Sequence, residues 1–493
     1  MRYKIYPAIG IARLGQDEDF IVGSERVGFA PTELSTPNNP VTRYKNQAKT
    51  QIRKQAARFH LFQSEDGSTW KPAELPAGAS VRWEVRLVNM KTAVTRPDEP
   101  PIKPTRPEVL DANQSMIIDG GMQSISGSNA TSAPFVGTFA TQASDGTPFS
   151  TSVTLGELRT DADGRLLVLG GSGISGAPPN TPLGGSYYKN PGWYDDVADG
   201  PVSASIQLSA GGPAQAAEGG AWVIVAPPDF APEIQGVVTL YDVIRQVSID
   251  EFGAPAPTSC SYDADIASLV GRMSALRFVN GNAHWKDPRL SDPKLRSPLL
   301  ADQPLRDGVR KALIGITNIL EGHTNSMGPK WELRTFQKNL LDLWVNGQFN
   351  ATPSTPNTDL SPDGLTRAAL EGAVGQGFCP GIEAGIIVLD KTLYSTPFDF
   401  RIDPGSVRPG ELTALMAQPW QSDFLDCNTD WWPTQRPDIA PQVGGTNKSW
   451  SRGIPANGHL ALVQHFGQLG FIVRQGAGQV FIESERDPLF PPP

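Results

Sequence analysis

The stretch "SVTLGELRTDADGRLLVLGG", residues 152–171, predicts two β-strands joined by a tight turn. Two apolar runs flank "DADG", residues 161–164, and aspartate and glycine are residues that hairpin turns prefer. A second stretch, "SVRWEVRLVN" at residues 80–89, alternates apolar and polar side chains with the period of two that a half-buried strand shows. These stretches predict that the chain folds around β-strands.

More strand-like runs lie between residues 115 and 250, namely "SMIIDGG", "PVSASIQLSAGG", "AWVIVAPPDF" and "GVVTLYDVI". The 50 glycines and 45 prolines make up about a fifth of the 493 residues, well above the average share. Because bulky apolar residues are scattered between them, this composition indicates a β-rich globular protein with many turns and not a disordered chain.

The pattern changes after residue 260. Residues 306–320, "RDGVRKALIGITNIL", and residues 331–349, "WELRTFQKNLLDLWVNGQF", carry apolar side chains at helical spacing. A third helix is predicted from Ser361, whose hydroxyl suits a helix N-cap and which precedes a proline suited to the first helical position. Gly375 and Gly377 are expected to end this helix.

Towards the C-terminus the runs "GIEAGIIVLD", "HLALVQHFGQLGFIVRQG" and "QVFIESE" are again interpreted as strands. We therefore predict an α+β, mainly β fold, with a large β-rich core and a helical insertion before Cys379. The expected regions are a β-rich one at 1–260, a helical one at 261–378 and a C-terminal β-rich one at 379–493. Together they are expected to form one compact unit.

Charge and composition limit the classes of partner. The formal net charge is -9 and no basic stripe is visible, so nucleic acid is not expected as a partner. No run approaches the roughly 18 apolar residues of a membrane helix, and "MRYKIYPAIGIARLG" lacks the features of a signal peptide. We expect a soluble protein made in the cytoplasm, with no membrane partner.

Only three cysteines are present, Cys260, Cys379 and Cys427, which cannot form a disulfide framework, and no zinc-ligand spacing is seen nearby. Cys379, in "EGAVGQGFCPGIEAG", is by default a small buried hydrophobe, with a disulfide to Cys427 as the next alternative. None of the five histidines has the local signature of a partner for a nucleophilic cysteine. No metal site is expected.

Trp431 and Trp432 lie in the loop "DCNTDWWPTQRPD". By default they are core aromatics or a stacking platform for sugars, but such a polar, proline-rich frame is costly to bury unless its groups are positioned for a purpose. Two other stretches have bland interpretations. The acids of "NPGWYDDVADGPV" suit turn caps better than an EF-hand, and "VAPPDFAPEIQGVVTLYDVI" suits a proline-rich crossing followed by a strand.

Eight stretches occur in a fixed order: "YPAIGIARLG", "GELRTDADGRLLVLGG", "NPGWYDDVADGPV", "VAPPDFAPEIQGVVTLYDV", "FQKNLLDLWVNGQF", "FCPGIEAG", "MAQPWQSDF" and "DWWPTQRPD". Together, from about residue 5 to about residue 475, they resemble the lysine ε-oxidase and glycine oxidase family of quinoprotein amino-acid oxidases. Enzymes of this family carry a cysteine tryptophylquinone made from their own side chains. The resemblance therefore implies an oxidoreductase.

The resemblance implies a thioether cross-link between Cys379 and a modified tryptophan, Trp432 or alternatively Trp431. The implied reaction is oxidative deamination of an amino acid or primary amine with O2, which releases an aldehyde or keto acid, ammonia and hydrogen peroxide. A general base is also needed, and Glu383 and Asp430 are the carboxylates nearest in sequence. Maturation in the family uses a separate flavoprotein, which is expected as a partner here, and a homo-oligomer is a further expectation.

One position departs from the family. An aspartate a few residues before the cysteine is thought to help build the quinone, and its place is taken here by Gly375. Either another carboxylate serves, or maturation is poor or takes a variant route, or the chain is a cofactor-less member that keeps the fold to bind a ligand or partner. A disulfide-bearing, sugar-binding β protein is the remaining alternative. Because related enzymes act outside the cell without an evident signal peptide, export is also open.

Overall fold

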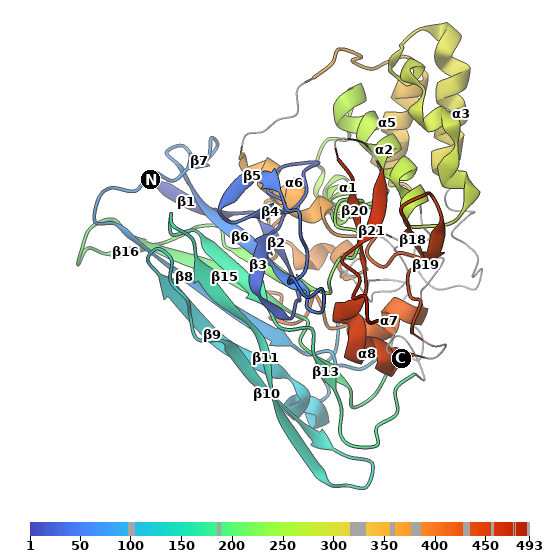
Figure 1. Ribbon diagram of the computed structural model, residues 1–493. Helices are drawn as coiled ribbons and strands as arrows, with labels where there is room; N and C mark the ends of the chain where they lie inside the picture. The colour runs from blue at the N-terminus through green and yellow to red at the C-terminus, as the bar shows by residue number, and fades with distance from the viewer. Residues whose placement is uncertain are drawn as a thin grey trace.

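A large mixed sheet forms the centre of the protein. We describe it in a computed structural model that covers residues 1–96, 104–184, 189–315, 332–354, 360–375, 386–426, 434–454, 458–476, 478 and 480–490 (Figure 1). The main path of the 15-stranded sheet has the order β10-β11-β12-β6-β2-β17-β15-β8-β9. These nine strands are β10 (Phe135–Gln142), β11 (Pro148–Thr160), β12 (Leu166–Gly170), β6 (Arg53–Ser64), β2 (Ile9–Arg13), β17 (Ala221–Ala226), β15 (Ala198–Gln207), β8 (Ser80–Asn89) and β9 (Ile118–Ser126).

Neighbours along this path pair antiparallel except β17 and β2, which are parallel. Six further strands pair beside it: β1 (Arg2–Tyr6), β3 (Asp17–Val22), β4 (Thr32–Glu33), β5 (Thr36–Pro40), β7 (Lys71–Pro72) and β16 (Ala214–Ala216). Three small two-stranded sheets complete the described strands: β13 (Ser175–Gly176) with β14 (Tyr194–Asp195), β18 (Ile439–Pro441) with β19 (Asn447–Ser449), and β20 (Phe471–Arg474) with β21 (Phe481–Ser484).

The predicted hairpin is confirmed as β11 and β12. Thr160 lies opposite Leu166, and the Gly164 N–H donates to the Asp161 carbonyl at 3.0 Å to close the turn. In β8 the alternation also has the predicted effect. Trp83 and Val85 are buried, whereas Arg82 and Arg86 are exposed. The local pattern of apolar residues therefore predicts these strands correctly.

The two ends of the strand path lie against each other. A Cβ on Gly120 of β9 would lie 2.6 Å from the Cβ of Phe135 in β10, and a Cβ on Gly137 would lie 2.7 Å from the Asp119 nitrogen. Glycine at both positions lets the two backbones approach closely. Figure 1 shows β9, β10 and β11 side by side at this end of the molecule.

The helices lie mainly on the other side of the molecule, with α2, α3 and α5 farthest from the β10–β11 end (Figure 1). The described α-helices are α1 (Leu240–Phe252), α2 (Ser268–Ala275), α3 (Gln303–Ile314), α5 (Thr335–Val345), α6 (Pro362–Glu371), α7 (Trp420–Asp426) and α8 (His459–His465). In the described ranges, no helix has the length and apolar character needed to cross a membrane.

Three of the predicted helices are confirmed as α3, α5 and α6. Helix α6 begins as predicted, since the Ser361 hydroxyl accepts a hydrogen bond from the Gly364 N–H at 3.0 Å. It ends at Glu371, four residues before Gly375, so the prediction that Gly375 ends it is wrong. The α+β, mainly β fold class is confirmed, and one buried apolar cluster joins residues of all three predicted regions, such as Phe59, Trp285 and Phe471.

Two predicted strands are wrong in the part that the structure describes, and a third is only partly right. "GVVTLYDVI" contains the start of α1, because Thr239 and Asp242 form a capping box: the Thr239 N–H donates to the Asp242 carboxylate at 2.8 Å, and the Asp242 N–H donates to the Thr239 hydroxyl. The described part of "GIEAGIIVLD" holds a 3₁₀ turn, Ile387–Leu389, and "HLALVQH" forms α8. Only the later part of that third run, β20, is a strand.

Candidate functional site

The predicted site residues fall in two short segments outside the described residues. Cys379 and Glu383 lie in residues 376–385, and Asp430, Trp431 and Trp432 lie in residues 427–433, as does Cys427. The described cysteine, Cys260, is buried and free. The candidate site is therefore built from the residues on both sides of these segments.

A single connecting loop, residues 227–240 between β17 and α1, contacts the chain just before Cys379. The Gly375 N–H donates to the Val238 carbonyl at 3.3 Å, and the Leu240 N–H donates to the Ala373 carbonyl at 2.9 Å. Residues 373–375 thus run antiparallel beside residues 238–240. The last described residue before the cysteine segment is fixed at this point.

The same loop contacts the chain just after the tryptophan pair. The Phe230 N–H donates to the Gln435 carbonyl at 2.9 Å, three residues beyond Trp432. The Phe230 ring lies in an aromatic cluster, with centroids 4.8 Å from Trp450, 5.1 Å from Phe471 and 6.0 Å from Phe424. Aromatic packing of this kind holds the backbone of the loop in place. The loop is therefore attached to both predicted cofactor segments.

Arg13, at the end of β2, holds this loop to the helix that precedes the cysteine. Its buried guanidinium donates to the Pro227 carbonyl at 2.9 Å and to the Gly372 carbonyl at 2.7 Å. Its Nη2 also lies 3.8 Å from the Asp229 carboxylate. Sequence reasoning missed Arg13 although it belongs to "YPAIGIARLG", because nothing local to a strand end indicates a bond to a residue 359 positions away.

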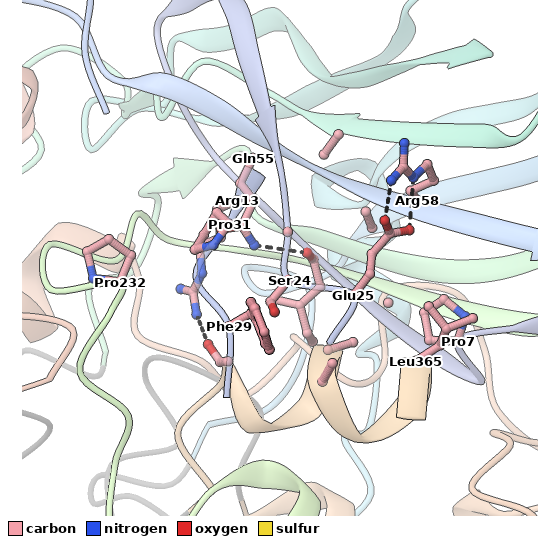
Figure 2. A pocket seen from close by; sticks show the side chains of 18 of the residues that line it. Pro7, Arg13, Ser24, Glu25, Phe29, Pro31, Gln55, Arg58, Pro232 and Leu365 are labelled. Carbon is pink, nitrogen blue, oxygen red and sulfur yellow. Dashed lines mark hydrogen bonds and ion pairs between the residues drawn. The ribbon is translucent and has the colours of Figure 1, made fainter. Parts of the chain in front are cut away.

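Arg13 also lines a pocket between the sheet and α6, with Glu25 and Arg58 on the far side of it (Figure 2). Burial alone would raise the pKa of Glu25, but hydrogen bonds from Arg58 and His60 hold that pKa at about 2. Glu25 therefore stays ionised at neutral pH and does not serve as a general base there.

A larger cleft of about 750 Å³ adjoins this pocket and shares Phe29, Pro232 and Gln235 with it. Its volume falls in the range of small-molecule sites, and its described lining includes Tyr44 and Arg474. The cleft thus extends to the loop of residues 227–240, which contributes Pro232, Glu233 and Gln235 to its lining.

Gly375 has no room for a side chain. A Cβ at this position would lie 1.9 Å from the Thr239 carbonyl oxygen and 2.5 Å from the Leu240 nitrogen, both of them backbone atoms. The aspartate that the family resemblance leads one to expect here is therefore incompatible with this backbone contact. The glycine at position 375, where the family resemblance leads one to expect an aspartate, is thus matched by a close backbone contact with Thr239.

Glu371 is the nearest described acid before the cysteine segment. It is buried and forms ion pairs with Arg272 at 2.9 Å and with Arg367 at 2.7 Å. Burial opposes its ionisation, but the two arginines lower its pKa below the ordinary value. Glu371 is therefore held as an anion in a structural network.

The acids of residues 190–202 also have structural roles. Asp195, Asp196 and Asp199 are buried, and burial together with the neighbouring Asp195 raises the pKa of Asp196 to about 7. They accept hydrogen bonds from N–H groups: Trp420 to Asp195, Gly173 to Asp196, and Trp222 to Asp199. These three bonds join distant segments and are not turn caps, whereas the Val197 N–H donates to Asp195, two residues before it, as in a turn cap. The described ranges hold no cluster of three or more potential metal ligands.

Unsatisfied hydrogen-bond donors surround the tryptophan segment. Four buried donor atoms on its two sides have no hydrogen-bond partner among the described residues: Trp420 Nε1, Ser422 Oγ, Arg436 Nε and Arg436 Nη2. Native proteins leave few buried donors unpaired, because each one costs free energy. The same surroundings also hold buried acceptors, the Asp423 carboxylate and the Gln435 side-chain amide, so groups of both kinds line the segment.

Comparisons with known proteins point to one family. Residues 6–225 match the L-lysine epsilon oxidase N-terminal family model, and residues 323–450, which include Cys379 and both tryptophans, match the L-lysine epsilon oxidase C-terminal domain model. L-lysine 6-oxidase from Marinomonas mediterranea is 25% identical over 530 residues, covering 87% of this chain and 71% of that protein.

Crystal structures of the L-Lys epsilon-oxidase from the same organism share the fold. One crystal structure of the enzyme is 22% identical to this chain, and a second, of its Schiff base intermediate with L-Lys, is 21% identical. Both have a TM-score of 0.78 and cover 98% of this chain and 95% of their own chains. Two models of one family, N-terminal and C-terminal, match in order along the chain, and the fold is shared over nearly its whole length. The protein therefore belongs to the L-lysine ε-oxidase family.

Proposed function

We propose that this protein oxidatively deaminates an amino acid or primary amine with O2, using a cysteine tryptophylquinone formed from Cys379 and Trp432, with Trp431 as the alternative. One observation carries the proposal: the loop of residues 227–240 forms backbone hydrogen bonds both with Gly375, just before the cysteine segment, and with Gln435, just after the tryptophan segment. Those residues lie four positions before Cys379 and three positions after Trp432.

Chain length supports the proposed cross-link. Four extended residues reach about 14 Å at most and three reach about 11 Å, so each predicted side chain stays near its anchor. Both anchors lie on a loop whose contact points, Phe230 and Val238, are eight residues apart. This spacing supports a thioether bond between two segments that are separated by more than fifty residues of sequence.

The described residues near the tryptophan segment fit the proposed quinone. An ortho-quinone presents two carbonyl acceptors, and the buried donors Trp420 Nε1 and Ser422 Oγ lie on the chain just before the tryptophan segment. Once formed, the quinone supplies a carbonyl for the substrate amine and a ring for its two electrons. The aromatic cluster around Phe230 lies on the loop that carries both anchors and would shield the proposed site from water. Glu383 or Asp430 is the proposed general base.

In this proposal the products are an aldehyde or keto acid, ammonia and hydrogen peroxide, and a separate flavoprotein assists maturation. The carboxylate for maturation has to come from a position other than 375. A second candidate function is favoured by the same lack of space: a cofactor-less family member that binds a ligand or partner without oxidising it.

Intact mass after production with the flavoprotein tests the proposal. A mature quinone gains two oxygens and loses four hydrogens relative to the encoded chain, whereas a disulfide loses only two hydrogens. The Cys379→Ala variant is expected to lack visible absorption and peroxide production. An unmodified mass for the parent, or peroxide production by that variant, contradicts the oxidase proposal, and an unmodified mass favours the cofactor-less alternative.

A further inference from the structure

The cleft of about 750 Å³ has a buried hydroxyl without a partner in its wall. Tyr44 lines this cleft and is 3% exposed, and its hydroxyl has no hydrogen-bond partner among the described residues. Tyr394 is comparably buried, at 4%, but its hydroxyl donates to the Val388 carbonyl. Because a buried polar group without a partner costs free energy, the Tyr44 hydroxyl indicates a partner from outside the chain.

The position of Tyr44 is fixed by its neighbours. Its N–H donates to the Glu485 carboxylate at 2.9 Å, and its carbonyl accepts a hydrogen bond from the Arg53 N–H at 2.9 Å. Its ring stacks on Phe471 with centroids 5.2 Å apart. Glu485 itself has φ +58°, and strain of this kind persists only where surrounding contacts hold it. The ring is therefore held in one defined place in the cleft wall.

The Tyr44 hydroxyl can act only as a neutral donor. Burial raises its pKa well above 10, and the Glu233 and Asp229 carboxylates raise that pKa further. Because the same two carboxylates repel an anion, a neutral oxygen suits this hydroxyl better than a charged one. The partner of Tyr44 is therefore expected to be a hydroxyl or carbonyl oxygen.

Arg277 places an uncompensated charge in the same cleft. The charged side chains in its described lining are Glu233, Arg272, Arg277 and Arg474. Glu233 pairs with Arg474 at 3.2 Å, and Arg272 pairs with Glu371 at 2.9 Å. Arg277 is half-buried and forms no ion pair with any described residue. An anion in the cleft would supply the missing counter-charge.

The edge of the Arg277 guanidinium defines the kind of anion. Nη1 donates to the Ser274 hydroxyl at 2.8 Å, and the guanidinium carbon lies 4.7 Å from the centroid of the Phe278 ring. Nε and Nη2 form no hydrogen bond with a described residue. Their N–H groups lie along one edge and point the same way, so together they match the two oxygens of a carboxylate.

Aromatic rings and small side chains line other parts of the cleft. Phe278 and Phe481 both belong to the lining, with centroids 5.2 Å apart. Helix α2 contributes the small residues Ser268, Gly271 and Ala275, and a Cβ on Gly271 would meet no atom within 4 Å. The cleft therefore offers both the space and the apolar contacts that a flat aromatic ring needs.

We propose that this cleft binds an aromatic carboxylate that also carries a neutral oxygen. Arg277 pairs with the carboxylate, and the Tyr44 hydroxyl donates to the neutral oxygen. The ligand needs no amine, so this binding site is additional to the proposed reaction site and does not depend on the proposed oxidase activity.

Packed rings join this cleft to the tryptophan segment. Phe471, on which Tyr44 stacks, lies 5.1 Å from the Phe230 ring, and the Phe230 N–H donates to the Gln435 carbonyl. The cleft is also lined by Pro232, which lies in the same loop as Phe230. A bound ligand is therefore expected to stabilise the loop of residues 227–240 as well as its own site.

Three related compounds without an amine test the assignment on protein made without the flavoprotein. They are 4-hydroxyphenylacetate, phenylacetate, which lacks the neutral oxygen, and 4-hydroxyphenylacetamide, which lacks the charge. Titration calorimetry measures their affinities, and the rise in Tm gives an independent measure. The parent is expected to bind the first compound about tenfold more tightly than either of the others, because each of them loses one hydrogen-bonded contact.

Two variants assign each contact to its residue. Tyr44→Phe is expected to bind 4-hydroxyphenylacetate and phenylacetate equally, and Arg277→Met is expected to bind 4-hydroxyphenylacetate and its amide equally. Arg82→Met, whose side chain is 58% exposed and outside the described lining, is expected to keep both differences. Without ligand, Tyr44→Phe should have a Tm at least equal to that of the parent, whereas Tyr394→Phe, which loses a hydrogen bond, should have a lower one.

Two results overturn the assignment. One is equal affinity of the parent for all three compounds, or no binding of any. The other is competitive inhibition of the mature enzyme by 4-hydroxyphenylacetate that Tyr44→Phe and Arg277→Met leave unchanged, which would place the compound in the reaction site. If the mature mass is unmodified but the calorimetric differences persist, the oxidase proposal fails while the carboxylate site in the cleft stands.

Discussion

The β11–β12 hairpin and the loop of residues 227–240 are held in different ways. The hairpin turn closes through the bond from Gly164 to Asp161, three residues apart, whereas the loop is held by Arg13, Gly375 and Gln435 from distant parts of the chain. A hairpin of this kind forms wherever its own sequence favours the turn. The loop takes its conformation only when the sheet, α6 and the tryptophan segment have assembled around it.

The hairpin is therefore part of the scaffold, whereas the loop is part of the candidate site. The register of the hairpin is set by the pairing of its own two strands, and Trp83 and Asn129 add hydrogen bonds to its turn. The loop instead depends on contacts with three remote segments, which contain Arg13, Gly375 and Gln435. The last two of these residues flank the predicted halves of the cofactor. Changes at the loop should therefore affect stability and cofactor formation together, while changes at the hairpin should affect stability alone.

The largest effect is expected from Gly375→Asp, which introduces the residue expected from the family resemblance. Its Cβ would lie 1.9 Å from the Thr239 carbonyl oxygen, so the loop contact has to break, at a cost of about 3 kcal/mol in the free energy of unfolding. Urea unfolding measures this cost, and visible absorption measures the quinone.

The matched control is Gly271→Ala in α2, where no atom lies within 4 Å of the added Cβ. Because alanine favours a helix, this variant is expected to be more stable than the parent by up to about 1 kcal/mol. A Gly375→Asp protein that is as stable as the parent and forms more quinone would mean that the contact with Thr239 is not needed.

A smaller effect is expected from Arg13→Met. The change leaves the buried Pro227 and Gly372 carbonyls without this donor, which costs about 2 kcal/mol by urea unfolding and lowers the yield of quinone. Arg82→Met is the control, because that side chain is 58% exposed and its ion pair with Glu84 contributes little. If Arg13→Met is destabilised but its quinone yield is unchanged, the contacts of Arg13 with the loop are not needed for cofactor formation.

Local pattern predicted strands such as β8, β11, β12, β15 and β17 and three helices. It missed other strands, among them β6 and β10, and it did not predict what depends on distant contacts. The apolar, β-branched run at residues 236–244 was interpreted as a strand although its capping box, Thr239 with Asp242, was visible in the sequence. Arg436 is one of 42 lysines and arginines, and no local spacing predicts that its side chain is buried. The steric contact at Gly375 likewise joins residues too far apart for any local pattern.

The pH dependence of stability tests a carboxylate that lies between the two regions. Asp196 accepts the Gly173 N–H just after β12, and its pKa is raised from 3.8 to about 7 by burial and by Asp195. Between these two values the folded protein keeps a proton that the unfolded chain has lost. The Asp196 contribution to stability is therefore present below about pH 4 and is lost as the pH rises through 7, by about 1 kcal/mol per pH unit.

Asp196→Asn cannot ionise, so its free energy of unfolding should fall less steeply than that of the parent between pH 4 and pH 7. Urea unfolding at several pH values gives the two slopes, and their difference removes the contribution of all other groups. Equal slopes would show that Asp196 ionises alike in the folded and unfolded states.

The smallest effect is expected at the hairpin turn, from Gly164→Ala. Gly164 has φ +75°, and the nearest atom to an added Cβ lies 3.7 Å away, so the cost is conformational and not steric, about 1 kcal/mol. Gly164→Asn should cost less, because asparagine tolerates this backbone region. Both variants should keep the quinone yield of the parent, since the strand pair is complete without the loop. A loss of quinone in Gly164→Ala that matches the loss in Gly375→Asp would mean that the hairpin, too, depends on the assembled site, and the contrast between a locally closed scaffold and a remotely held loop would no longer stand.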